Sequence, residues 1–268
     1  MDREQELLEV IHKGNDLIAV QDELINNYEK QVLTQNAIIK KQEDIKPSQS
    51  QDRGVGSMKY ILMCGGDYHT DQPKQLRQYG TGITIVERTI LQLRLAGVED
   101  IAISSNDKRF EKFGVPVLHH KNDFGNGGHW LEAFYPTEEP VCYIFGDVFF
   151  SPDAISKIVK TETDSIEFFA SAPPFHPEYS KQWAEPFAFK VVDTKLFRAC
   201  IDETIYKAEQ GIFKREPIAW ELWQVIKNTK LNEIDYTNYV AINDYTTDFD
   251  NDEEFNEFVE KKWGKEIK

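Results

Sequence analysis

The sequence predicts an α/β domain that follows a long amino-terminal helix, and three observations lead to this fold class. Short, wholly apolar runs, typical of buried parallel strands, alternate with segments in which apolar residues recur at helical spacing. A seven-residue apolar repeat occupies the start of the chain. A stretch rich in Pro, Ser, Gln and Gly separates that repeat from the alternating part. We therefore expect a helix over residues 1–45, a linker over 46–57 and a folded domain over 58–268.

The seven-residue repeat predicts a coiled coil. A helix with this period leaves an apolar seam uncovered, and helices with such seams supercoil around partners. We therefore expect residues 7–39 to join copies of the chain into a homo-oligomer. Packing of this helix on its own domain is the alternative, and Gly-Ser-Met at 56–58 is also typical of an artificial junction. The repeating pairs are Val10-Ile11, Leu17-Ile18, Leu24-Ile25, the weaker Gln31-Val32, and Ile38-Ile39.

The folded part opens with a strand, a helix and a second strand. The apolar run 60–64 ends at two glycines, as a buried parallel strand does. Thr84 and Glu87 have the spacing of a capping box, and the apolar residues that follow predict a helix over 84–96. A second apolar run lies at 101–103. A right-handed crossover would place both strands in one parallel sheet.

Later segments continue the α/β pattern. Further strands are expected in a mixed, mainly parallel sheet, together with three more helices. The expected strands are 141–145, 165–170 and 187–192, and the expected helices are about 195–209, 217–228 and 252–262.

Three strand ends carry glycine or polar residues. They are Gly65-Gly66-Asp67 after the first strand, 104–107 after the second, and Gly146-Asp147 after a later one. Ligands of open parallel sheets bind beyond the carboxyl ends of the strands. We therefore expect these three segments to converge on one site, although glycine after a strand is also ordinary turn chemistry.

Composition argues against several classes of partner. The 268 residues carry 46 acidic and 31 basic side chains, a formal charge of -15 that repels nucleic acid and anionic lipid. Apolar runs such as 141–145 are far shorter than the roughly 20 residues of a membrane helix. The acidic start lacks the basic and apolar order of a secretory signal, so a cytoplasmic protein is expected. The odd, widely spaced cysteines favour buried thiols over disulfides or zinc.

The order of these segments resembles the GT-A-like nucleotidyltransferases, which join a nucleoside triphosphate to a phosphorylated sugar, polyol or amino-alcohol. The resemblance implies a Rossmann-like GT-A domain, with Mg²⁺ as the cofactor. A looser match is Ile242-Asn243-Asp244 with Asp248, similar to a late acidic segment of the cytidylyltransferase branch. The matching pieces are 61–66 (first strand and phosphate loop), 73–76 (Pro-Lys segment), 85–101 (first helix and second strand), 122–130 (nucleoside-contacting turn) and 145–148 (metal-binding Gly-Asp).

The resemblance also implies roles for individual residues. Lys74 would meet the α-phosphate, and Asp147 with Asp244 would hold Mg²⁺; Asp248, Asp250 and Asp252 offer the same chemistry as Asp244. Tyr179, Trp183 and Glu185 would line the acceptor site, where aromatic faces and a carboxylate suit a cation such as phosphocholine, although core packing explains such aromatics equally well. The residues expected to bind the nucleotide, for which CTP is a candidate, are Cys64, Gly65, Gly66, Asn106, Gly125, Asn126, Gly127 and Gly128.

The phosphate loop departs from the family pattern. Between Gly66 and Pro73 the chain has no arginine, but it has Asp67 and Asp71, which would repel a triphosphate without a cation. Two alternatives therefore stand beside a nucleotidyltransferase. One is a GT-A glycosyltransferase that consumes a nucleotide sugar, and the other is a catalytically silent domain for nucleotide binding or oligomerisation.

Overall fold

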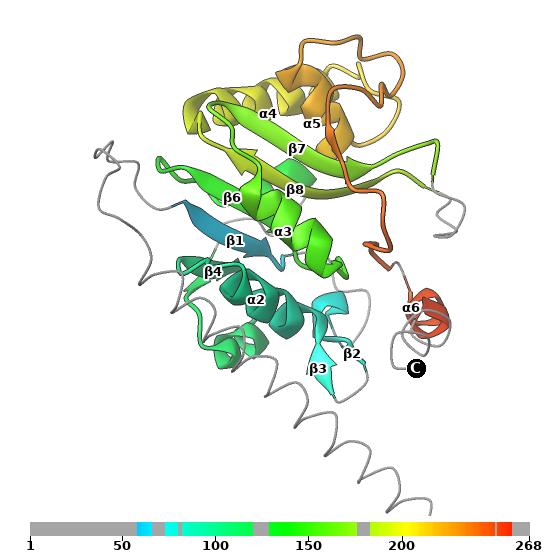
Figure 1. The fold of residues 1–268 in the computed structure, drawn as a ribbon. Helices are drawn as coiled ribbons and strands as arrows, with labels where there is room; N and C mark the ends of the chain where they lie inside the picture. The colour runs from blue at the N-terminus through cyan, green and yellow to red at the C-terminus, as the bar shows by residue number, and fades with distance from the viewer. Residues whose placement is uncertain are drawn as a thin grey trace, which may run out of the picture. The chain divides into compact units, whose positions relative to one another are not determined.

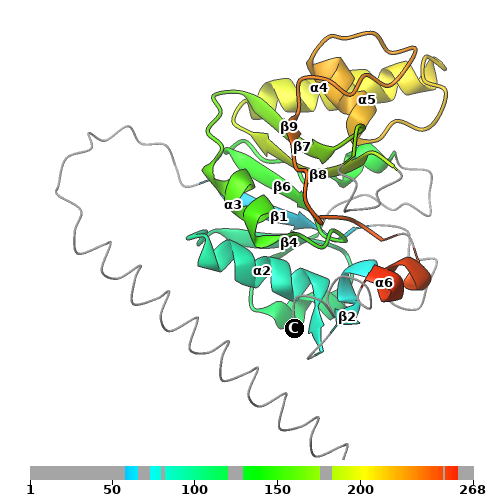
Figure 2. The ribbon, with the colours of Figure 1, turned by 45° about the vertical axis from the view of Figure 1, so that its right-hand side comes forward.

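The computed structural model describes a single unit of the chain. All described residues belong to Val55–Lys268, the second of two units into which the chain divides. The predicted coiled coil over 7–39 and the linker over 46–57 lie outside the described residues. None of the described helices has both the length and the apolarity that a membrane crossing requires. The described residues are 58–65, 73–79, 82–119, 129–175, 183–249 and 251–258 (Figures 1 and 2).

A mixed, mainly parallel sheet forms the centre of this unit, which confirms the predicted α/β class. Its strand order is β5-β4-β1-β6-β8-β7-β9. Within this sheet β8 alone runs antiparallel to its neighbours β6 and β7, and all other neighbouring strands are parallel. The strands are β1 Lys59–Met63, β4 Ile101–Ser104, β5 Val117–Leu118, β6 Val141–Phe145, β7 Ile166–Ser171, β8 Glu185–Val191 and β9 Val240–Ala241.

The first βαβ unit has the predicted form. Helix α2 (Ile85–Leu95) begins at Thr84, whose side chain accepts a hydrogen bond from the Glu87 backbone N–H, while the Glu87 carboxylate accepts one from the Thr84 N–H. These two bonds satisfy donors that a helix start leaves open. Strand β1 then pairs in parallel with β4, with Tyr60 opposite Ile101. A small ribbon of β2 (Gln78–Tyr79) and β3 (Ile83–Thr84) precedes α2 and was not predicted.

Helices cover both faces of the sheet (Figures 1 and 2). On one face α2 packs beside α3, and the buried Lys190 ammonium on β8 donates to the carbonyls of Val159 and Thr161 at the end of α3. Helices α4 and α5 lie on the other face. The predicted helices near 195–209 and 217–228 are confirmed, and α3 was not predicted. The remaining helices are α3 Pro152–Lys160, α4 Thr194–Glu209, α5 Ala219–Ile226, α6 Asp252–Phe258 and the short turns η1 Lys74–Leu76, η2 Lys108–Phe113 and η4 Trp130–Ala133.

Aromatic side chains fill the core beneath α4 and α5. Phe168 on β7 and Phe189 on β8 stack with ring centroids 4.5 Å apart, and Trp220 of α5 meets Phe168 edge-on at 4.9 Å. Phe197 of α4 stacks on Tyr143 of β6 at 5.7 Å. Each buried ring contributes about 2–3 kcal/mol through apolar burial. This packing holds the strands rigidly, so that their ends can position a site.

Candidate functional site

The sheet reverses its direction of growth between β1 and β6. From β1 the chain proceeds through α2 to β4 and then to β5 on one side, and β6 afterwards pairs with the opposite side of β1. Such a switch point opens a crevice at the carboxyl ends of the two central strands. The residues that directly follow these strands are Cys64 and Gly65 after β1, and Gly146 and Asp147 after β6.

Gly146 allows these two strand ends to lie close together. Its N–H donates to the Met63 carbonyl at 3.0 Å. A Cβ added at this glycine would lie 2.6 Å from the Cys64 sulfur and 2.7 Å from the Met63 carbonyl oxygen. Cβ atoms in proteins essentially never lie within 3.0 Å of such neighbours. Only glycine fits this position without displacing the neighbouring strand, and it brings the half-buried Asp147 beside the end of β1.

The Cys64 thiol is inert in this position. It is fully buried, and burial, followed by the negative charge of Asp147, raises the pKa of the thiol well above its ordinary value. A neutral thiol is a poor nucleophile and a poor metal ligand. Cys64 therefore contributes packing and its backbone to the site, whereas Asp147 contributes the charge.

The end of β4 lies on the other side of β1. The Cys64 N–H donates to the Ser104 carbonyl at 2.9 Å, and the Asp107 N–H donates to the Ser105 hydroxyl at 3.1 Å. The exposed Asn106 lies within this turn. The structure thus places the three strand ends side by side, as their positions after parallel strands predict.

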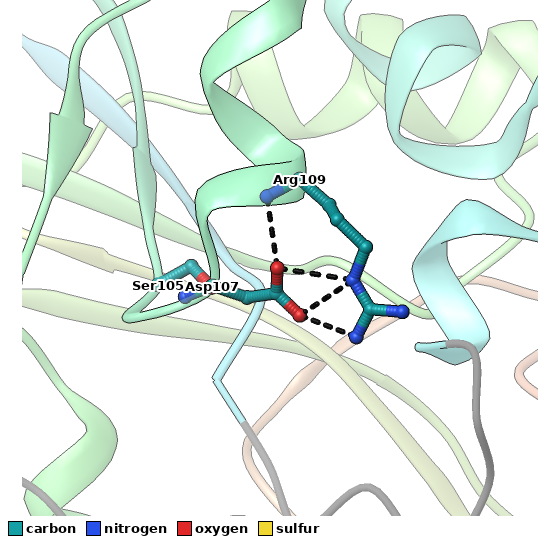
Figure 3. Close-up of polar contacts among 3 residues, drawn as sticks. All are labelled: Ser105, Asp107 and Arg109. Atoms are coloured by element: carbon teal, nitrogen blue, oxygen red, sulfur yellow. Dashed lines mark hydrogen bonds and ion pairs between the residues drawn. The ribbon is translucent and has the colours of Figure 1, made fainter.

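Arg109 neutralises the carboxylate in the β4 turn (Figure 3). Its backbone N–H donates to Asp107 Oδ1 at 2.8 Å, and its guanidinium Nη2 donates to Oδ2 at 2.5 Å. The Arg109 hydrogen bonds hold the pKa of the Asp107 carboxyl below its ordinary value, despite some burial. Asp107 therefore stays ionised and paired, and the turn that presents Asn106 is fixed by its own side chains.

A segment near the carboxyl terminus completes the same edge. Phe149, two residues after Asp147, exchanges backbone hydrogen bonds with Thr247 at 2.7 and 3.2 Å. The Thr247 hydroxyl donates to the Glu185 carboxylate at the start of β8, at 3.1 Å. Asp248 follows Thr247 directly. The Phe149–Thr247 pair and the Thr247–Glu185 hydrogen bond thus connect the segments that carry Asp147, Glu185 and Asp248.

Asp244 is engaged by the start of α3. Its Oδ2 accepts a hydrogen bond from the Ser151 hydroxyl at 2.5 Å, and its Oδ1 accepts one from the Thr246 N–H at 2.7 Å. The Ser151 hydroxyl also accepts from the Ala154 N–H at 2.9 Å and so caps α3. Both Asp244 oxygens therefore serve the fold. Sequence spacing could not distinguish this residue from Asp248.

Lys74 lies in the η1 turn, on the side of the sheet where the strands end. The turn appears in cyan beside β2 in Figures 1 and 2, next to the amino-terminal end of α2. The Arg77 carbonyl, directly after this turn, accepts a hydrogen bond from the Ile85 N–H at 3.1 Å. The half-buried Lys74 thus belongs to a turn that packs against α2, and Asp147 directly follows β6.

Two buried polar atoms near this edge were not anticipated from the sequence. The side-chain oxygen of Gln75, next to Lys74, and the hydroxyl of Ser104, the last residue of β4, are buried and have no hydrogen-bond partner in the described part of the chain. Leaving a buried polar group unpaired costs about 1–3 kcal/mol.

The remaining predicted site residues are either exposed or outside the described ranges. Trp183, two residues before Glu185, keeps 75% of its surface exposed and does not pack in the core. Within the described ranges no group of three or more His, Cys, Asp or Glu side chains is placed to hold a metal ion. The predicted nucleotide-binding or acceptor residues outside the described ranges are Gly66, Gly125, Asn126, Gly127, Gly128 and Tyr179.

Comparisons with known proteins give distant likenesses. No protein-family model matches the sequence, and no curated protein matches it. Among solved structures, one described as a glucose-1-phosphate thymidylyltransferase from Bacillus anthracis is 15% identical, with a TM-score of 0.48 over 76% of this chain and 94% of that one. An inositol-1-phosphate CTP transferase from T. maritima is 17% identical, with a TM-score of 0.45 over 77% and 97%. HddC from Yersinia pseudotuberculosis is 12% identical, with a TM-score of 0.45 over 76% and 99%.

Proposed function

We propose that this protein is a magnesium-dependent nucleotidyltransferase. It would transfer a nucleoside monophosphate from a nucleoside triphosphate, with CTP as a candidate, to a phosphorylated sugar, polyol or amino-alcohol. The observation that carries this proposal is the switch point between β1 and β6, where Gly146 allows Asp147 to lie beside Cys64 and Gly65. A strand that ends at glycine with a carboxylate nearby suits a polyphosphate with its cation, because glycine lets phosphate oxygens approach the backbone closely.

The reaction asks the chain mainly for position and charge. An oxygen of the acceptor phosphate forms a bond to the α-phosphorus, the bond from that phosphorus to the bridging oxygen breaks, and pyrophosphate leaves with the electron pair. Backbone N–H groups around Gly65 can approach the phosphates closely because no side chain blocks them. Lys74, in the η1 turn, would neutralise charge that develops at the α-phosphate.

The carboxylates of this edge fit Mg²⁺ together with phosphate oxygens. In proteins this ion commonly takes one or two carboxylates and completes its octahedron with substrate phosphates and water. Asp147 and Asp248 would hold it, because the Phe149–Thr247 backbone pair brings their two segments together. When bound, the ion would offset the charge of the triphosphate and of the acidic loop.

The acceptor would bind beside the start of β8. Trp183 offers an exposed aromatic face, and Glu185 offers a carboxylate that Thr247 orients. An aromatic face and a negative charge together favour a cationic group, as in phosphocholine. Tyr179 belongs to the same stretch of sequence and is proposed for the same site.

Pyrophosphate release tests the proposal directly. Full-length protein would be assayed with CTP, UTP, GTP or ATP, Mg²⁺, and glucose 1-phosphate, inositol 1-phosphate or phosphocholine. We expect release with one nucleotide and one acceptor class, and a loss of at least about 100-fold in Asp147→Asn. Asp153→Asn, at an exposed position of α3, is the matched control and should retain activity.

Other results of this assay would favour a different function. Nucleotide binding without turnover would favour the silent nucleotide-binding domain, which the absence of arginine between residues 66 and 73 already suggests. Consumption of a nucleotide sugar without pyrophosphate would favour a glycosyltransferase. Wild-type activity in Asp147→Asn would remove that carboxylate from the mechanism.

A further inference from the structure

The last described segments of the chain connect the sheet edge to the Lys74 turn. We call residues 244–249 and 251–258 the strap. Its first half is fastened to the end of β6 by the Phe149–Thr247 backbone pair and to α3 by Ser151. Its second half contains α6, which lies close to β2 and the η1 turn in Figures 1 and 2.

Arg77 joins the strap to the turn. Its backbone N–H donates to the Lys74 carbonyl at 3.1 Å, so its own position and that of Lys74 are coupled. Its guanidinium Nη1 donates to the Phe249 carbonyl at 3.3 Å and lies over the Phe255 ring, 5.9 Å from the centroid. One half-buried side chain therefore contacts the strap twice while its backbone holds the turn.

An aromatic cluster makes this connection rigid. Phe249 and Phe255 are buried and meet edge to face at 5.1 Å, in a small core shared with Ile85 at the start of α2 and Phe149 after β6. A second arginine, Arg88 of α2, lies 4.1 Å from the centroid of the Phe149 ring. Because buried rings are closely packed, a displacement of one ring displaces its neighbours, whereas solvated side chains are not coupled in this way.

The strap residue that precedes the Arg77 contact is Asp248. The Arg77 guanidinium donates to the carbonyl of Phe249, and Asp248 is the residue directly before Phe249. On its other side, the Arg77 backbone is bonded to Lys74. Arg77 therefore contacts both the turn that carries Lys74 and the segment that carries Asp248, the two charged residues assigned to one polyphosphate.

We propose that Arg77 is a positioning residue that sets the placement of Lys74 relative to the Asp248 segment. This inference rests on the proposed function, because it assigns Lys74 and Asp248 to one ligand. A misplacement of a catalytic group by 1 Å can cost about 100-fold in rate. Lysine cannot replace arginine fully here, since its single point charge lacks the planar guanidinium with several fixed donors.

Substitution of Arg77 tests the inference by turnover and by hydrogen exchange. We expect Arg77→Gln to lower kcat about tenfold or more with a smaller change in the KM for the nucleotide, and Arg77→Lys to recover part of it. Amide exchange over 73–79 should become faster in Arg77→Gln. The control is Arg94→Gln, which removes an exposed arginine at the end of α2 and should change neither quantity.

A double-mutant cycle separates positioning from general loss of structure. If Arg77 acts through Lys74, the pair Lys74→Ala and Arg77→Gln should lose no more activity than Lys74→Ala alone. Multiplicative losses would overturn the inference. Phe255→Leu, which removes the ring but keeps an apolar side chain, provides a second route if Arg77→Gln folds poorly, and it should lower kcat in the same direction.

Failure of the proposed function can be told apart from failure of this inference. If wild-type protein releases no pyrophosphate with any nucleotide, the proposed function fails, and hydrogen exchange alone decides the coupling. Equal exchange over 73–79 in wild type, Arg77→Gln and Arg94→Gln would then show that Arg77 does not hold the turn.

Discussion

At the scale of single residues, the absence of a side chain at Gly146 allows the ends of β1 and β6 to lie close together. Gly146 lies between the Cys64 sulfur and the Met63 carbonyl, with no space for a Cβ. The glycine before Asp147 is easily read as ordinary turn chemistry from the sequence. The structure shows a different requirement, which is the close approach of two parallel strands.

Gly146→Ala is expected to destabilise the protein by about 3 kcal/mol, since overpacking against buried atoms costs about 1–3 kcal/mol and one neighbour is backbone. Urea unfolding followed by tryptophan fluorescence would measure the loss. The control is Gly211→Ala, where nothing lies within 4 Å and only the φ of +68° opposes a side chain. That control should cost about 1 kcal/mol. A Gly146→Ala loss no larger than the control would contradict the steric account.

At the scale of elements, the start of α3 links the helix to the carboxyl-terminal strap. The Ser151 hydroxyl caps α3 through the Ala154 N–H and donates to Asp244, and the Ser151 N–H donates to Thr246. A helix cap is usually a local feature of sequence. Here the cap residue also holds a segment that lies more than 90 residues away in the chain.

Ser151→Ala should therefore cost about 2 kcal/mol of unfolding free energy, the upper range for loss of a cap, because the Asp244 carboxylate also loses a donor. Denaturation in urea would measure this cost. Ser151→Thr keeps the hydroxyl and should stay close to wild type. The double variant Ser151→Ala with Asp244→Asn should lose less than the sum of the two single losses; additive losses would mean that the two side chains are not coupled.

At the scale of the whole molecule, the heptad repeat over 7–39 predicts self-association, and this segment lies outside the described residues. Equilibrium sedimentation of the full chain should give a multiple of its 31.1 kDa mass, because an uncovered apolar seam is satisfied by a second helix. A chain that starts at Met58 should sediment as a monomer. Equal monomer masses for both chains would contradict the coiled coil.

Much of the fold could be predicted because it depends on local patterns. The apolar runs at 60–64, 101–103 and 141–145 became the adjacent strands β1, β4 and β6, since a strand buried on both faces has to be apolar throughout. The Thr84 and Glu87 capping box marked the start of α2 correctly. The antiparallel direction of β8 and the short ribbon of β2 and β3 have no comparable local signal.

By itself, the sequence determined the fold class and which strand ends carry glycine and carboxylate, because burial and backbone geometry impose these choices residue by residue. Tertiary structure alone decided that Asp244 bonds the cap residue of α3 while Asp248 follows the residue that pairs with Phe149, and that Arg77 connects the Lys74 turn to the strap. Neighbouring aspartates are chemically equal in a sequence. They become different only when strand pairing and side-chain packing assign their hydrogen-bond partners.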